Sequence, residues 1–342
     1  MSSIRRELVA LIERGAIPRE QVPRAVALSG LHPSRRAWGV FLDRLLLWLG
    51  TLALASALLF LVAYNWTEMG RWLRFGLVQV GLVAAIGVYW WSEGRGPVDE
   101  GRADEGRADN GVVDNIVARA ALTTASLLLG VLLALFGQVY QTGADPWQLF
   151  FLWAVLMLPW VLVARFDALW ILWLGLLNLS LLLYFRTWGG AFDVFFSSDT
   201  AALWGLFALN TVALALWELG AQRWRWLSTG WSTGLLALGS GIPLTLLMLM
   251  FILDEWADVS AAVLVYPLWL AILYVAYRHW RPDLFMLAGG CLSVIVVVTT
   301  FFGRHLLWQG GAGGFLFLSM AVLALGAMAV FWLKRVHVEI SA

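Results

Sequence analysis

Ten apolar runs, each about as long as a bilayer is thick, constrain this 342-residue chain more than any other feature. A transmembrane helix needs roughly 20 apolar residues, because backbone polar groups inside lipid must be paired within the segment. Only 13% of the residues are charged, against about 25% in soluble domains. The sequence therefore predicts an all-α, polytopic helical membrane protein whose surroundings are the lipid bilayer. The predicted spans are 45–64, 73–91, 118–138, 147–164, 168–185, 201–217, 231–252, 261–277, 284–302 and 314–333.

Polar segments divide the chain into regions. The first region has the pattern of a short helical segment at the membrane surface, in which Gly15 ends one helix and Pro18 starts the next. A tandem Asp-Glu-Gly-Arg-Ala repeat between the second and third spans offers no apolar residue to bury, so we expect a disordered linker. The predicted regions are the helical segment 1–42, the first two spans 43–91, the linker 92–117, an eight-helix bundle 118–335 and the tail 336–342.

The basic residues predict the orientation of the spans. With the N-terminus inside and ten spans, most of the 23 lysines and arginines fall on inner segments. The exceptions on outer segments are Arg71, Arg74, Arg186 and Arg304. Inner loops of membrane proteins carry such an excess of positive charge. We therefore expect both termini on the cytoplasmic side.

Composition argues against several function classes. A net charge of +1 gives no footprint for nucleic acid. The single cysteine, Cys291, cannot form an internal disulfide, and the four histidines are far apart. No ionisable residue falls near the middle of a predicted span, which argues against a proton-driven pump. We predict no cofactor, no metal site and no catalytic residue.

The segment from Phe136 to Trp147 is the most polar end of any apolar run. A turn explains part of it: a helix would end near Thr142, Gly143 would adopt the left-handed conformation, and Asp145 would cap a helix that Pro146 begins. A turn does not explain why glutamines and a tyrosine replace leucine here. We therefore predict that Gln138, Tyr140 and Gln141 bind a ligand.

Two asparagines lie in the middle of consecutive spans. Asn178 and Asn210 are candidate ligand-binding residues, but a hydrogen bond between them would equally hold the two helices together. The Gly239-Ser240-Gly241 sequence and Pro243 also have two interpretations. They indicate either a broken helix facing a cavity or small residues that allow close helix packing.

The N-terminal pattern LVxLIExGxIPxEQ over residues 8–21, followed by two spans, resembles a bacterial family of predicted membrane proteins, the domain of unknown function 2157. The resemblance covers residues 4–91 best, with Phe136–Trp147 as a second match. It implies a bacterial inner-membrane location, and it brings no substrate or catalytic residue.

Three function classes stay open at this stage. The first is a translocator or channel-like protein that carries a small molecule or lipid through a neutral polar cavity. The second is a non-catalytic membrane component that binds a protein partner through residues 1–42. The third is a membrane enzyme that uses the outer carboxylates Asp254, Glu255 and Asp258. The oligomeric state does not follow from the sequence.

Overall fold

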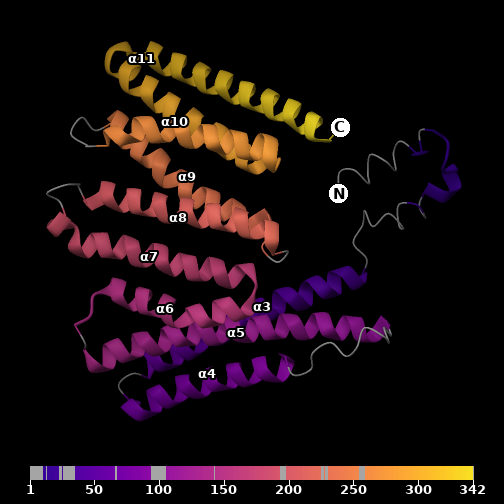
Figure 1. Ribbon diagram of the computed structural model, residues 1–342, viewed down its shortest axis with the longest axis vertical. Helices are drawn as coiled ribbons and strands as arrows, with labels where there is room; N and C mark the ends of the chain where they lie inside the picture. Colours follow the sequence, from indigo (N-terminus) through magenta and orange to yellow (C-terminus); the bar gives the residue numbers. More distant parts are fainter. Residues whose placement is uncertain are drawn as a thin grey trace. The chain divides into compact units, whose positions relative to one another are not determined.

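The computed structural model describes residues 11–12, 14–22, 25, 35–65, 68–93, 105–141, 143–192, 198–224, 227, 230–253 and 259–341. These residues form helices and connecting turns and contain no strand (Figure 1). The elements are the 3₁₀ turn η1 (Arg19–Gln21), α3 (Arg35–Tyr64), α4 (Arg71–Glu93), α5 (Glu105–Tyr140), α6 (Pro146–Ala164), α7 (Asp167–Phe192), α8 (Ser198–Arg223), α9 (Gly230–Leu253), α10 (Ser260–Val275), the π-helical turn η3 (Ala276–Trp280) and α11 (Leu284–Ser341).

Ten helical segments of the described residues are long and apolar enough to cross a membrane, which confirms the all-α polytopic fold. Each overlaps one predicted span. The largest differences are a start at 38 instead of 45 and an end at 340 instead of 333. The segments are Trp38–Leu61, Arg71–Ser92, Ile116–Tyr140, Pro146–Ala164, Asp167–Thr187, Thr200–Arg223, Trp231–Leu253, Ser260–Trp280, Leu284–His305 and Gly313–Ile340.

The structure differs from the predicted regions on both sides of the bundle. Helix α5 begins at Glu105, so residues 105–117 are helical where a disordered linker was expected, while 94–104 lie outside the described residues. Likewise α11 continues to Ser341, so most of the predicted tail is helix. The physical reason is the same in both places. Extending an existing helix adds a hydrogen bond for each residue ordered, without the cost of a new nucleus.

The described part of residues 1–42 agrees with the local predictions. Gly15 has φ of 71° and ends a helical turn. Its N–H donates to the Ile12 carbonyl, and the next N–H, of Ala16, donates to the Leu11 carbonyl, which is the Schellman pattern. After Pro18 the chain forms the short turn η1, and Val22 and Ala25 beyond it are helical.

The chain forms two compact units, residues 1–132 and 133–342. In the first, α3, α4 and the first part of α5 meet at Gly81. A Cβ at this glycine would lie 3.0 Å from Leu58 Cδ1 and 3.3 Å from Leu128 Cδ1. Val78 and Leu128 are fully buried at this contact. A glycine therefore sets how closely the three helices approach.

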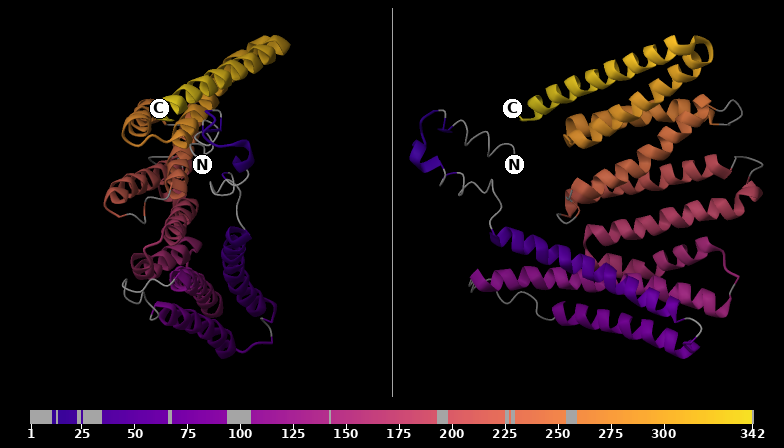
Figure 2. Two further views of the ribbon diagram at one scale, coloured as in Figure 1. Left: turned by 90° about the vertical axis from the view of Figure 1, so that its right-hand side faces the viewer. Right: turned by 180° about the vertical axis from the view of Figure 1, so that it is seen from behind.

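In the second unit, helices α6 to α11 lie side by side in chain order, and α11 also packs against α9 (Figures 1 and 2). Figure 1 shows that α11 turns back on itself, so its two apolar segments form two arms. Helix α9 contacts α7, α8, α10 and α11, and its Leu236, Leu244 and Leu247 are almost completely buried. From this central place α9 reaches both the pair formed by Asn178 and Asn210 and the hydroxyl groups around Thr245, which are described below.

Candidate functional site

The connection between α5 and α6 has the turn geometry that the sequence indicates. Helix α5 ends at Tyr140, Gly143 has φ of 64°, and Pro146 is the first residue of α6. The left-handed glycine and the position of Pro146 are therefore confirmed. Gln141 also has a left-handed backbone, with φ of 43°. This conformation costs a non-glycine residue roughly 1–2 kcal/mol.

The predicted role of Asp145 as a cap is wrong in one respect. Asp145 occupies the N-cap position with an extended backbone, φ −64° and ψ 147°, but its carboxylate makes no capping hydrogen bond. Only its backbone carbonyl takes part, accepting from the Gln148 N–H at 3.0 Å. The carboxylate therefore remains available.

A cavity of about 620 Å³ lies at this connection, within the second unit. Its polar lining combines Gln138 from the end of α5, Gln141 and Asp145 from the turn, and Gln148 from the first turn of α6. The apolar lining includes Phe136, Leu149 and Leu152. The sequence pattern indicated Gln138 and Gln141 but not Gln148. It lies seven positions beyond Gln141, on the far side of a turn.

The polar side chains of this cavity are not used to hold the fold together. Within the described part of the chain, Gln138, Gln141, Asp145 and Gln148 make no side-chain hydrogen bond. The three glutamines are exposed and Asp145 is half-buried. Each amide offers two N–H donors and one acceptor, and the carboxylate accepts only. The set suits an uncharged polar ligand, or a ligand that presents a donor or a positive charge to Asp145.

Tyr140 does not line the cavity. Its side chain is 55% exposed, and its ring packs on that of Phe136 with the centroids 4.7 Å apart. Because Phe136 does line the cavity, Tyr140 contacts the site through this phenylalanine.

Asn178 and Asn210 form hydrogen bonds with each other, as expected if they hold their two helices together. The Asn178 amide N–H₂ donates to Asn210 Oδ1 at 3.2 Å, and the Asn210 amide donates to Asn178 Oδ1 at 2.6 Å. The second amide proton of each reaches the carbonyl four residues earlier, Leu174 and Leu206, each at 2.8 Å. All four amide protons and both oxygens are therefore engaged, and neither asparagine lines the glutamine cavity.

Gly239 on α9 packs directly against this asparagine pair. A Cβ at Gly239 would lie 2.8 Å from Asn210 Oδ1, closer than two such atoms can approach. Gly241, two residues on, leaves room for the ring of Trp269, which a Cβ would meet at 3.0 Å. Both contacts agree with the close-packing interpretation of the Gly239-Ser240-Gly241 sequence, and α9 is one continuous helix through it.

An ionic cluster lies where α8, η3 and α11 meet. Glu218 accepts from the Tyr277 hydroxyl at 3.0 Å and from Arg281 Nη1 at 2.6 Å, and Arg278 pairs with Glu339. No pattern in the sequence indicates this cluster, because its members are separated by about sixty positions. Its acids and bases neutralise one another, which is typical of a structural clamp.

Among the described residues, no three His, Cys, Asp or Glu side chains are placed to hold a metal ion. The outer carboxylates Asp254, Glu255 and Asp258 lie outside the described residues.

Comparison with known proteins finds a family that the chain resembles. No curated protein and no solved structure matches the chain. Residues 10–170 match a family model described as "Predicted membrane protein (DUF2157)". The match begins in the N-terminal pattern and extends through the glutamine cavity. It confirms the resemblance noted in the sequence and extends it: residues 10–170 are similar to this family of predicted membrane proteins.

Proposed function

We propose that this protein binds a small polar molecule or a lipid headgroup in the glutamine cavity between α5 and α6. The observation that carries the proposal is the set of unused polar groups there. Gln138, Gln141 and Gln148 surround a 620 Å³ space beside Asp145, whose carboxylate is free of capping. Ligand cavities commonly measure about 300–1,000 Å³ and combine an apolar wall with a few polar groups.

The predicted topology places this cavity at the outer face of the membrane. Both termini would lie in the cytoplasm of a bacterial cell, and the connection between the third and fourth spans would face outward. A ligand would then reach the cavity from the extracytoplasmic side or from the outer leaflet. The location in the bacterial inner membrane rests on the family resemblance.

Binding is better supported than passage through a channel. A translocation path would need polar groups that continue from the cavity into the bundle. The asparagine pair is the polar group that the sequence offers for such a path, and its donors and acceptors are already engaged. A bound ligand would have to open this pair to use it. We therefore propose that the protein acts as a receptor or carrier, which holds its ligand between the outer ends of α5 and α6.

The test is complementation of a strain that lacks the gene. Lipid and metabolite profiling of this strain first identifies which compounds change. The Gln138→Leu, Gln141→Leu double variant should then fail to restore the profile at matched protein levels, and Asp145→Asn should restore it only in part. Gln79→Leu is the matched control, because Gln79 is an exposed glutamine of another span, outside the cavity. Full complementation by the double variant would refute the proposal.

A further inference from the structure

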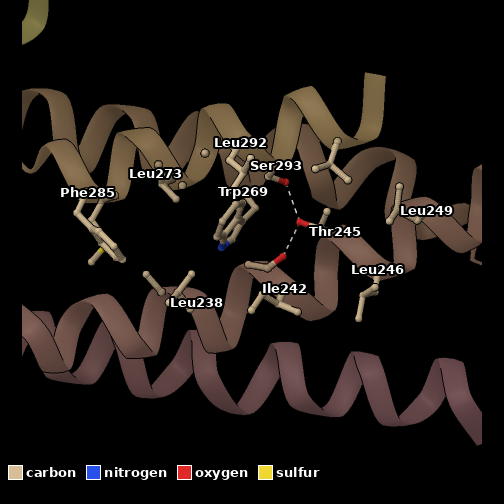
Figure 3. Close-up of a pocket in the computed structure, with 16 residues that line it drawn as sticks. Leu238, Ile242, Thr245, Leu246, Leu249, Trp269, Leu273, Phe285, Leu292 and Ser293 are labelled. Carbon is tan, nitrogen blue, oxygen red and sulfur yellow. Dashed lines mark hydrogen bonds between the residues drawn. The ribbon is translucent and has the colours of Figure 1, made fainter. Parts of the chain in front are cut away.

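A second cavity, of about 260 Å³, lies between α9, α10 and α11 (Figure 3). All of its lining belongs to three of the membrane-spanning segments. Ile242 and Leu292, which are 54% and 63% exposed, belong to this lining. The cavity therefore opens toward the lipid. No charged residue lines it, so an ionic ligand group would be left without a partner at membrane depth.

The polar part of this cavity is a chain of three hydroxyl groups. Thr245 Oγ1 donates to the Gly241 carbonyl at 2.7 Å and lies 2.7 Å from Ser293 Oγ, which in turn lies 2.8 Å from the Tyr266 hydroxyl (Figure 3 shows the first two bonds). A hydroxyl has one proton. Since Thr245 gives its proton to the carbonyl, Ser293 must donate to Thr245, and Tyr266 must donate to Ser293.

This direction leaves the chain without a free donor. The protons of all three hydroxyls are used within the protein, whereas Thr245 Oγ1 and Ser293 Oγ, which line the cavity, each keep an unused lone pair. A ligand that forms a hydrogen bond to these hydroxyl groups must therefore supply the donor itself.

Trp269, which lines the cavity from α10, adds a hydrogen-bond donor. Figure 3 shows the indole nitrogen of Trp269 directed into the space between the helices. Its N–H makes no hydrogen bond to any residue that the structure describes. The indole ring is held in place by the close approach at Gly241. The cavity thus offers one N–H donor and a hydroxyl acceptor on otherwise apolar walls.

We propose that this cavity binds a single-chain lipid alcohol, such as a fatty or isoprenoid alcohol, from the bilayer. A hydroxyl group accepts from the Trp269 N–H and donates to Thr245 or Ser293, and the hydrocarbon chain covers the apolar walls. The volume of 260 Å³ holds the hydroxyl end of one chain, since about 150 Å³ suffices for a benzene molecule, and the rest of the chain extends through the opening into the lipid. This site is separate from the glutamine cavity and does not depend on its role.

The experiment uses the purified full chain in phosphatidylglycerol vesicles with a hexadecanol probe that carries a diazirine and an alkyne. We expect saturable crosslinking to peptides of α9 and α11. Unlabelled hexadecanol should compete best, its methyl ether about fivefold less well because it only accepts, and hexadecane least. Palmitate, which is charged, should compete no better than hexadecane.

Variants assign the two hydrogen bonds. In Trp269→Phe the methyl ether should fall to the level of hexadecane. In the double variant Thr245→Val, Ser293→Ala, which removes both hydroxyl acceptors, the alcohol should fall to the level of the ether. Gly289→Leu should reduce crosslinking at least tenfold, because Gly289 lines the cavity and a Cβ there meets no atom within 4 Å. Gly175→Leu is the control, since Gly175 has equally open surroundings on α7.

Two results would overturn the proposal. Crosslinks spread evenly over the lipid-facing helices and unchanged in Gly289→Leu would show that no defined site exists. Equal competition by alcohol, ether and alkane would show that the polar groups do not select the ligand. Should Gly289→Leu not fold, the competition series in Trp269→Phe and in the Thr245→Val, Ser293→Ala variant decides the matter, because these substitutions remove hydrogen-bonding groups and add no bulk to the cavity.

Discussion

Replacing the asparagine pair by leucine tests whether Asn178 and Asn210 serve the fold or a ligand. The single change Asn210→Leu removes both bonds between the two amides and leaves Asn178 with only its bond to the Leu174 carbonyl. Hydrogen bonds between membrane helices contribute about 0.6 kcal/mol on average and up to about 1.7. Two such bonds, at 3.2 and 2.6 Å, and one partly unsatisfied amide suggest a cost of about 1–3 kcal/mol.

The double variant Asn178→Leu, Asn210→Leu should cost less than the sum of the two single changes. It removes the pair without leaving an orphaned amide, and replacing both partners by apolar groups of similar shape is often nearly neutral. We therefore expect a coupling free energy of about 1 kcal/mol or more in a double-mutant cycle. The assay is reversible unfolding of the purified protein in bicelles, followed by tryptophan fluorescence and circular dichroism.

Gly239→Ala provides an independent check on the same contact. Its Cβ would lie 2.8 Å from Asn210 Oδ1, so the asparagine must move, at a cost of about 1–3 kcal/mol. In a protein that already carries Asn210→Ala, Gly239→Ala should cost much less stability, because the contacting amide is gone. Additive single-variant costs, or an Asn178→Leu variant as stable as the wild type, would refute the structural role and return both residues to the ligand-binding hypothesis.

Two further predictions concern the turn and the topology. Gly143→Ala should destabilise the protein by about 1–2 kcal/mol, because its φ of 64° disfavours a Cβ. The control Gly87→Ala lies within a helix and should be stabilising. Both glycines have open space around them, so the difference in thermal unfolding between the two variants reports the backbone effect. In a variant without Cys291, a cysteine placed at Gln148 should react with a membrane-impermeant maleimide on intact cells and one at Arg102 should not; labelling of the Arg102 position from outside would contradict the predicted orientation.

The sequence by itself determined the spans and their local turns. The length of an apolar run is a local property that lipid, acting as solvent, converts directly into a helix, so ten spans follow without knowledge of any partner. The left-handed Gly143 and the start of α6 at Pro146 are equally local. Where the prediction was wrong, as at 105–117, helix propagation extended an element into a segment with no apolar signal of its own.

Only the tertiary structure decided which side chains meet. In water, an apolar stripe marks the face of a helix that turns inward, but a membrane helix is apolar on all sides, so its sequence does not mark that face. The pairing of Asn178 with Asn210 needs the register of α7 against α8, and the hydroxyl chain of Tyr266, Ser293 and Thr245 needs three helices at once. Asp145 had the right position for a cap, but its side-chain conformation left the carboxylate free beside the glutamines. Packing, rather than hydropathy, placed the polar groups of both cavities.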